Sequence, residues 1–273
     1  MGSLHDFLAS ADQITEVEDA TAAGRGTLGV RVEVQRLNKF FGTHHVLRDL
    51  DLSVDPGETF VIFGPSGCGK SVLLKHIAGL LTPDSGRLLI DGEDLQAGEG
   101  RHRFRMAMVF QSSALFNSLS VGENVGLWLK EHRISSRAEI AKIVAEKLAL
   151  VGLTGQEKAM PSELSGGMRK RVSIARALAV NPHLILYDEP TAGLDPVLTE
   201  QIGHVIVDLK KLKITSIVVT HDLNLGFHVA EHLGMIHEGR LIETGTPATI
   251  RATKNPVVRA FITTQTKILE GGG

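Results

Sequence analysis

Short apolar runs alternate along this chain with longer segments whose apolar residues recur at helical spacing. Continuous apolar runs are typical of strands buried on both faces, and the chain has them at 59–63 (TFVIF), 106–110 (MAMVF), 184–190 (LILYDEP) and 215–220 (TSIVVT). Residues 31–41 begin with the alternation of a half-exposed strand, and residues 86–95 read as a further strand and turn. Residues 234–245 predict a hairpin that turns at Glu238 and Gly239.

Three segments show the spacing of amphipathic helices. Residues 71–81 follow a glycine-rich stretch, and residues 137–153 carry apolar side chains on one helical face. Residues 195–213 begin with Asp195 at the N-cap and Pro196 at the first helical position. The core face of this last helix would consist of Ile202, Val205, Ile206, Leu209 and Leu212.

The alternation of strands and helices predicts an α/β fold, with a mostly parallel sheet covered by helices on both faces. From about residue 112 to 180 the pattern is helical and interrupts that order, so we expect a second, helical lobe inserted into the first. We expect residues 1–28 to form a flexible acidic extension, residues 29–262 the main domain and residues 263–273 a short tail.

Composition narrows the range of partners. The 273 residues carry a formal net charge of -2, which offers no global attraction to nucleic acid or to an anionic bilayer. No apolar run approaches the ~20 residues of a membrane-spanning helix, and the N-terminus lacks the pattern of a secretory signal. Cys68 is the single cysteine, so no internal disulfide can form.

The stretch between the run at 59–63 and the first helix has the pattern Gly-x-x-x-x-Gly-Lys-Ser. Its glycines let the backbone wrap around a phosphate without Cβ clashes, and the N–H groups that begin the helix favour an anion. Lys70 should reach the β- and γ-phosphates, the Ser71 hydroxyl suits Mg²⁺, and Cys68 is interpreted as a small filler rather than a nucleophile. We therefore predict a site for ATP and Mg²⁺ formed by Gly64, Pro65, Ser66, Gly67, Cys68, Gly69, Lys70, Ser71 and Val72.

The run LILYDEP ends with two adjacent carboxylates. Its apolar residues would deliver Asp188 to the carboxyl end of the sheet, where ligands bind in open α/β folds. Asp188 is expected to hold Mg²⁺ through a water molecule, and Glu189 to orient or deprotonate the attacking water. The alternative, two surface carboxylates at a strand end, is disfavoured by the phosphate-binding pattern nearby.

The motifs GPSGCGKS, ELSGGMRKR, LILYDEP, AGLD and VVTHD occur in the order seen in ATP-binding-cassette (ABC) ATPases, which the chain resembles from about residue 31 to 262. LSGGM is the most specific of these motifs, since general P-loop NTPases lack it. The resemblance implies a P-loop NTPase core with an antiparallel β subdomain and an inserted α-helical subdomain. It also implies ATP hydrolysis by two facing copies of the chain, with two ATP molecules between them.

Ser165, Gly166 and Gly167 of the LSGGM motif precede the helical segment MRKRVSIARALA. A helix N-terminus left bare by two glycines favours an anion, so we expect these residues to meet the γ-phosphate of the ATP held by the facing copy. An ordinary capped helix start is the alternative, and it accounts for Ser165 but not for the paired glycines.

The resemblance also assigns roles outside these motifs. Phe41 would stack on adenine, with the adjacent Phe40 or a core position for the ring as alternatives. Gln111 would touch Mg²⁺ and the attacking water and would begin the inserted lobe, His221 would contact the γ-phosphate, and Asp195 would signal between the two sites as well as cap its helix. The expected catalytic residues are Glu189, His221, Gln111 and Lys70, and the expected metal ligands are Ser71, Gln111 and Asp188.

Within the family, residues 111–132 and the segments EKLALVGL and NPVVRAF are similar to the ATPases of the Mla and Mce lipid-trafficking transporters, including the chloroplast TGD system. That resemblance implies a peripheral protein on the cytoplasmic face of the inner (plasma) membrane. It would reach the membrane only through an integral-membrane permease, which a lipid-binding Mce- or Mla-type subunit would accompany. Ala114, Leu115 and Phe116 would face a permease helix, unless Leu115 and Phe116 pack inside the inserted lobe.

Three other functions remain as alternatives. The chain could serve another importer or exporter, such as one for amino acids or lipoproteins, with identical catalytic residues. A non-transport cassette acting on ribosomes or DNA is disfavoured by the single cassette and the absence of a basic excess. A catalytically dead scaffold is disfavoured by the intact set of Lys70, Asp188, Glu189 and His221.

Overall fold

The computed structural model describes residues 29–96 and 104–270, the last five of these by their backbone alone. The extension expected at residues 1–28 and the closing glycines of the expected tail lie outside the described residues.

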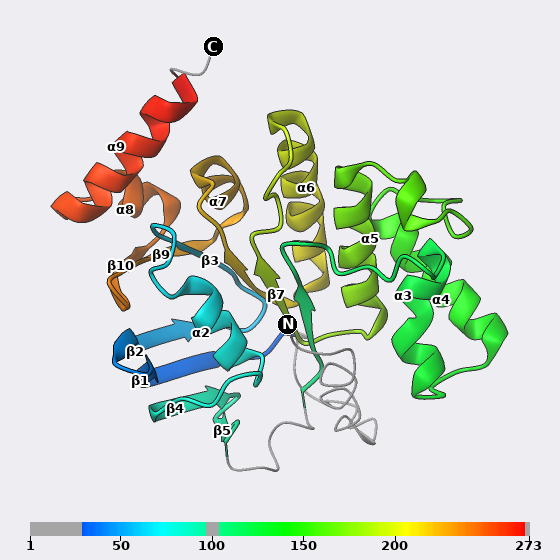
Figure 1. Cartoon of the computed structure of the whole chain (residues 1–273), viewed down its shortest axis with the longest axis horizontal. Helices are drawn as coiled ribbons and strands as arrows, with labels where there is room; N and C mark the ends of the chain where they lie inside the picture. Colours follow the sequence, from blue (N-terminus) through cyan, green and yellow to red (C-terminus); the bar gives the residue numbers. More distant parts are fainter. Residues whose placement is uncertain (1–28, 97–103, 271–273) are drawn as a thin grey trace.

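A six-stranded sheet with the order β10-β9-β3-β8-β7-β6 forms the centre of the molecule (Figure 1). Neighbouring strands from β9 to β6 run parallel, whereas β10 pairs antiparallel with β9. The strands are β3 (Thr59–Phe63), β6 (Met106–Val109), β7 (Leu184–Asp188), β8 (Thr215–Val219), β9 (His232–His237) and β10 (Arg240–Gly245). The mostly parallel sheet and the hairpin at Glu238 and Gly239 are confirmed.

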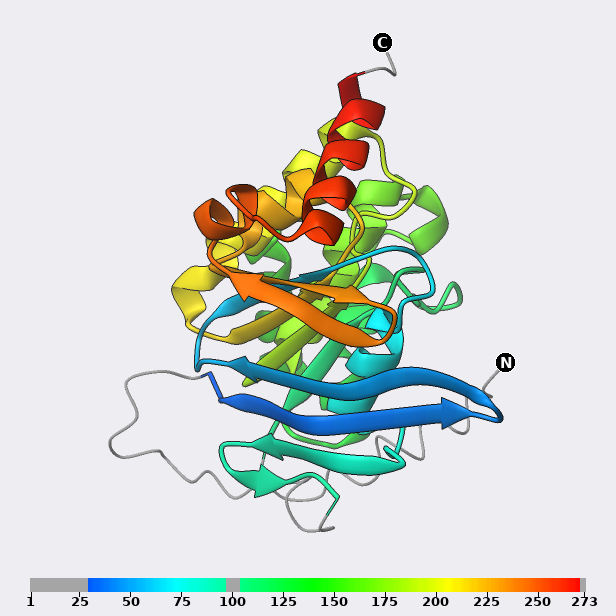
Figure 2. The same ribbon diagram turned by 90° about the vertical axis from the view of Figure 1, so that its left-hand side faces the viewer.

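A second, antiparallel sheet with the order β2-β1-β4-β5 forms a separate layer (Figure 2). Its strands are β1 (Val32–Phe41), β2 (His44–Val54), β4 (Ser85–Ile90) and β5 (Glu93–Asp94). Helix α2 (Lys70–Ile77) shares one hydrophobic core with this sheet and with one face of the central sheet. The antiparallel β subdomain expected from the resemblance is therefore present.

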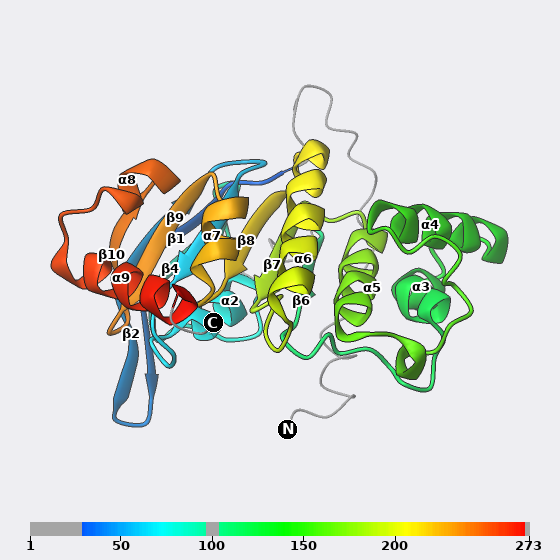
Figure 3. The same ribbon diagram turned by 90° about the horizontal axis from the view of Figure 1, so that it is seen from above.

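Three helices that lie between β6 and β7 in the sequence form a lobe to one side of the central sheet (Figure 3). These helices are α3 (Val121–Glu131), α4 (Arg137–Leu150) and α5 (Gly166–Ala179). Residues 112–120 form turns, so the helices of the predicted lobe start only at Val121. The remaining helices follow the sheet strands and are α6 (Pro196–Leu209), α7 (Leu223–Val229), α8 (Pro247–Arg251) and α9 (Pro256–Glu270).

Strand β3 is buried along its whole length because the two faces of the central sheet belong to two different cores. Phe60 and Ile62 pack with α2 and the antiparallel sheet. Val61 and Phe63 point to the opposite face and pack with residues of the helices that follow β6. Alternate side chains of a strand point to opposite faces, so a continuous apolar run fits a sheet covered on both sides.

One helix end differs from the predicted bounds. Helix α2 ends at Ile77, not near residue 81, because Gly79 adopts a left-handed conformation with φ of 71°. The N–H groups of Gly79 and Leu80 donate to the carbonyls of His76 and Lys75, which closes the helix with a Schellman-type cap. Helix α9 continues to Glu270, past residue 262 where we placed the end of the main domain, and that boundary stays a prediction.

Within residues 29–96 and 104–270, every helix is too short or too polar to cross a bilayer.

Candidate functional site

The loop between β3 and α2 combines one crowded glycine with one open glycine. A Cβ on Gly64 would lie 2.2 Å from the carbonyl oxygen of Ile236, so only glycine fits there. At Gly67, with φ of 79°, a Cβ would meet nothing within 4 Å. Gly69, with φ of 109°, brings the loop against Leu47 of β2 and precedes the first residue of α2. The loop therefore follows the sheet edge closely and keeps open space above its middle, as a phosphate cradle requires.

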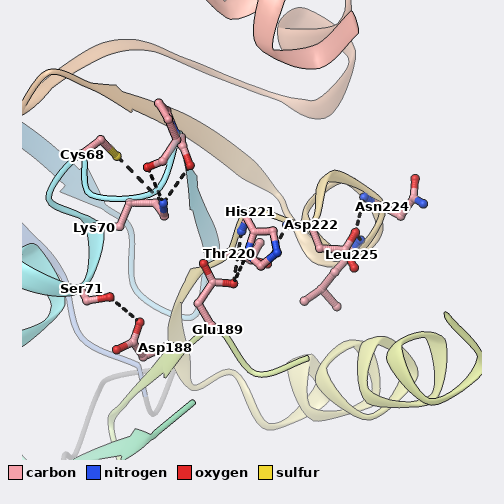
Figure 4. Close-up of polar contacts among 12 residues, drawn as sticks. Cys68, Lys70, Ser71, Asp188, Glu189, Thr220, His221, Asp222, Asn224 and Leu225 are labelled. Carbon is pink, nitrogen blue, oxygen red and sulfur yellow. Dashed lines mark hydrogen bonds and ion pairs between the residues drawn. The ribbon is translucent and has the colours of Figure 1, made fainter. Parts of the chain in front are cut away.

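Lys70 extends across this loop and is 7% exposed. Its Nζ donates to the carbonyl oxygens of Gly64 at 2.8 Å and of Pro65 at 3.0 Å, and lies 4.0 Å from Sγ of Cys68 (Figure 4). Burial raises the pKa of the Cys68 thiol, although the positive charge of Lys70 acts in the opposite direction. A thiol with a raised pKa is a poor nucleophile at neutral pH, so Cys68 fits the filler role that we predicted for it.

Ser71 and Asp188 converge from two different elements. Ser71 lies in the first turn of α2 and Asp188 is the last residue of β7, and Oγ of Ser71 donates to Oδ1 of Asp188 at 2.8 Å (Figure 4). A hydroxyl and a carboxylate at this separation are two hard oxygen donors that Mg²⁺ accepts. The two residues therefore lie together, as the predicted metal site requires, although 117 positions separate them in the sequence.

Glu189 and His221 form a hydrogen-bonded pair where β7 and β8 end. Oε2 of Glu189 accepts from Nδ1 of His221 at 2.8 Å and from the backbone N–H of His221 at 3.3 Å (Figure 4). Glu189 has a left-handed backbone with φ of 49°, a strained conformation for a non-glycine residue, and its own N–H donates to the carbonyl of Val219. The Glu189 side chain is 13% exposed and the His221 side chain is 56% exposed, so the histidine is the open side of the pair.

Gln111 lies in the turn after β6, and its side chain is exposed. Its backbone carbonyl accepts a hydrogen bond from the buried ammonium of Lys170, which also lies 3.5 Å from the carbonyl oxygen of Glu189. The structure therefore connects Gln111 and Glu189 through their main chains. Sequence analysis missed Lys170, although its spacing to Ile174 and Ala177 places it on the buried face of α5.

Ser165 caps α5, since its hydroxyl accepts from the N–H of Met168 at 3.2 Å. A Cβ on Gly166 would lie 3.1 Å from Leu194, and a Cβ on Gly167 would lie 3.0 Å from Leu198. Packing within one chain therefore explains why both positions are glycine, which helix capping alone did not explain. The same packing joins the start of α5 to the segment that contains Asp195, and Asp195 caps α6 by accepting from the N–H of Leu198 at 2.9 Å.

Phe40 and Phe41 are both exposed at the end of β1, by 43% and 49% respectively, so the core alternative for Phe41 is wrong. Phe40 is stacked on His45, with ring centroids 3.9 Å apart. Lys39 lies 5.6 Å from the centre of the Phe41 ring. Each ring therefore has a neighbour from the same chain over it, and the adenine role of Phe41 stays a prediction.

The turn after Gln111 is held by two side chains, one half-buried and one buried, that sequence analysis also missed. Arg176 of α5 donates to the carbonyls of Ser113 and Ala114, which both have a left-handed backbone. Burial lowers the pKa of Arg176 to about 10, which leaves the guanidinium charged at neutral pH. Asn124 of α3, fully buried, bonds to both the N–H and the carbonyl of Phe116.

Comparisons with known proteins identify the family of the chain. The profile of the ABC transporter family matches residues 47–192. The chain is 41% identical over 244 residues to the probable ribonucleotide transport ATP-binding protein mkl of Mycobacterium leprae, covering 88% of this chain and 70% of that protein. It is 40% identical over 254 residues to the chloroplastic protein trigalactosyldiacylglycerol 3 of Arabidopsis thaliana, covering 86% of this chain and 74% of that protein. A solved dimeric ATP-binding cassette, in a post-hydrolysis state with ADP and Pi, matches with a TM-score of 0.70 and 32% identity over 79% of this chain and 98% of that one.

Proposed function

Because the chain belongs to the ABC transporter family of ATP-hydrolysing subunits, we propose that it powers the movement of lipids between membranes through a separate permease. As an ATPase of this family it binds ATP with Mg²⁺ and serves a transport system. The observation that carries the lipid assignment is the likeness to the Arabidopsis protein, whose name is that of a galactolipid. The mycobacterial relative is named for ribonucleotide transport, so a ribonucleotide is the second candidate for the transported molecule.

The geometry supports distinct roles for the residues of the site. Lys70 and the loop that it crosses would bind the β- and γ-phosphates, and Ser71 with Asp188 would hold Mg²⁺. The metal supplies charge neutralisation during phosphoryl transfer. Glu189 would accept a proton from the attacking water, and His221 fixes the direction of its carboxylate through two hydrogen bonds.

Two copies of the chain would complete each site. Ser165 is exposed at the start of α5. The related cassette bound to ADP and Pi is a dimer. Ser165, Gly166 and Gly167 would therefore contact the γ-phosphate held by the partner copy, with Asp195 beside them.

The turn that contains Ala114, Leu115 and Phe116 is the proposed contact with the permease. Ala114 is exposed, and Leu115 and Phe116 are half-buried, with Leu115 packed against the core of the helical lobe. Arg176 and Asn124 hold the backbone on both sides of this apolar segment. A rigid apolar segment that begins beside Gln111 could transmit a change at the γ-phosphate to a membrane helix. Through that contact the chain would lie on the cytoplasmic face of the inner membrane, together with a lipid-binding Mce- or Mla-type subunit.

Purification of the tagged chain from its native membrane in mild detergent tests this proposal. We expect a permease to copurify and phospholipid to be the small molecule that mass spectrometry identifies in the complex. A bound ribonucleotide other than ATP or ADP would favour the second candidate. ATPase activity that rises with nucleic acid but not with the membrane partner would contradict transport altogether.

A further inference from the structure

A buried lysine joins two segments of the proposed catalytic site. Lys170 lies near the start of α5, is 4% exposed, and directs its ammonium to the carbonyl oxygens of Gln111 and Glu189. Lysine is rarely buried, because the charge loses its hydration unless partners replace it. Burial lowers the pKa of Lys170, while the negative charges of Asp188 and Glu189 act to raise it.

The position of Lys170 coincides with the end of a β-ladder. The pairing of β6 with β7 ends at Val109 and Tyr187, and Gln111 and Glu189 each lie two residues beyond it. Ladder hydrogen bonds fix β6 and β7 relative to each other up to that point but not beyond it. The ammonium of Lys170 reaches both chains where the ladder stops.

The contact also acts on a strained peptide. Glu189 has its left-handed φ of 49°, and its N–H is held by the carbonyl of Val219 on β8. Its carbonyl points toward Lys170. The backbone on both sides of the Glu189 side chain is therefore held, by β8 on one side and by α5 on the other.

We propose that Lys170 is a positioning residue for ATP hydrolysis, which sets the backbone from which Gln111 and Glu189 present their side chains. This inference rests on the proposed roles of Gln111 and Glu189. Ser165 caps α5 and would contact the ATP bound by the partner copy. Lys170 lies on the same helix, so a single side chain connects the two nucleotide sites. Its ammonium is directed to two backbone carbonyls, so its effect should fall on the rate of hydrolysis and not on the affinity for ATP.

The substitution Lys170→Met tests this in the full-length chain, since methionine keeps an unbranched side chain but has no donor. Lys170→Arg keeps a positive donor, and Lys142→Met removes an exposed lysine from α4 of the same lobe. The measurements are kcat and KM for ATP, the Kd of a fluorescent ATP analogue, and the thermal midpoint with and without MgATP. We expect Lys170→Met to lower kcat about 10- to 100-fold, as a small misplacement of catalytic groups does, with Kd nearly unchanged. Lys170→Arg should regain part of the rate, and Lys142→Met should match the wild type.

A wild-type kcat for Lys170→Met would overturn the proposal, and so would a Kd that rises as much as kcat falls. If Lys170→Met does not fold, Lys170→Gln, whose amide can still donate, receives the same measurements. Failure of both variants to fold would also overturn the proposal, by making Lys170 a residue required for folding. Glu189→Gln measured in parallel separates the two levels of inference. If that variant hydrolyses ATP normally, the assigned site is wrong, whereas a slow Glu189→Gln beside a normal Lys170→Met rejects only the role of Lys170.

Discussion

Replacement of Glu189 by glutamine should separate ATP binding from ATP hydrolysis. Glutamine has nearly the same shape, and its amide oxygen can still accept from Nδ1 and the N–H of His221. The oxygen that accepts these hydrogen bonds no longer carries a negative charge. Because His221 is half exposed, this loss should change the free energy of unfolding by about 1 kcal/mol or less. The amide cannot take a proton, so the general-base contribution of about 10²- to 10⁴-fold, or ~3–5 kcal/mol of the activation barrier, should be lost.

The assay is single-turnover hydrolysis of ATP, with size-exclusion chromatography in MgATP. We expect slow hydrolysis and accumulation of an ATP-bound dimer, because closure needs ATP and reopening needs hydrolysis. Glu200→Gln, which alters an exposed glutamate on α6, is the matched control and should behave as the wild type. Rapid turnover by Glu189→Gln with an intact fold would refute the assignment of the general base.

Two further changes test the nucleotide platform and the proposed permease contact. Phe41→Ala should weaken ATP binding about fivefold, because ~1 kcal/mol of ring stacking is lost. Phe40→Ala should leave the Kd of a fluorescent ATP analogue almost unchanged. A larger loss of affinity in Phe40→Ala than in Phe41→Ala would assign adenine stacking to Phe40. Asn124→Ala leaves the backbone N–H of Phe116 without its partner, whereas the carbonyl of Phe116 still accepts from the N–H of Leu119. The substitution should destabilise the chain by about 1–3 kcal/mol in urea unfolding and reduce permease binding, whereas exposed Asn117→Ala should do neither; an Asn124→Ala variant as stable as the wild type would contradict this account of the turn.

Sequence patterns were sufficient for the parts of the fold that depend on periodic burial. The run TFVIF is apolar throughout because β3 lies between two cores, and the same reasoning located β7 and β8. The end of α2 was missed because Leu80 and Leu81 continue the apolar spacing, while the cap depends on the single left-handed residue Gly79. The backbone conformation of Gly79 therefore ends the helix although the apolar spacing continues.

The chemistry of the site was predictable where it lies in contiguous motifs, and less so where it depends on long-range contacts. Asp188 and Glu189 were found next to each other in the sequence, but the left-handed backbone that directs Glu189 toward His221 leaves no mark in composition. The packing of Gly167 against Leu198 was likewise invisible, because it joins two helices. Lys170 was missed because a lysine within a basic helical segment is usually a solvated residue.

The alternation of β3 between two cores restricts how this segment can change over time. Insertion of one residue within 59–63 would exchange the side chains that face α2 with those that face the helices after β6. The same insertion would move Gly64 away from the carbonyl of Ile236, where no larger residue fits. The number of residues between the antiparallel layer and the phosphate loop is therefore constrained during evolution.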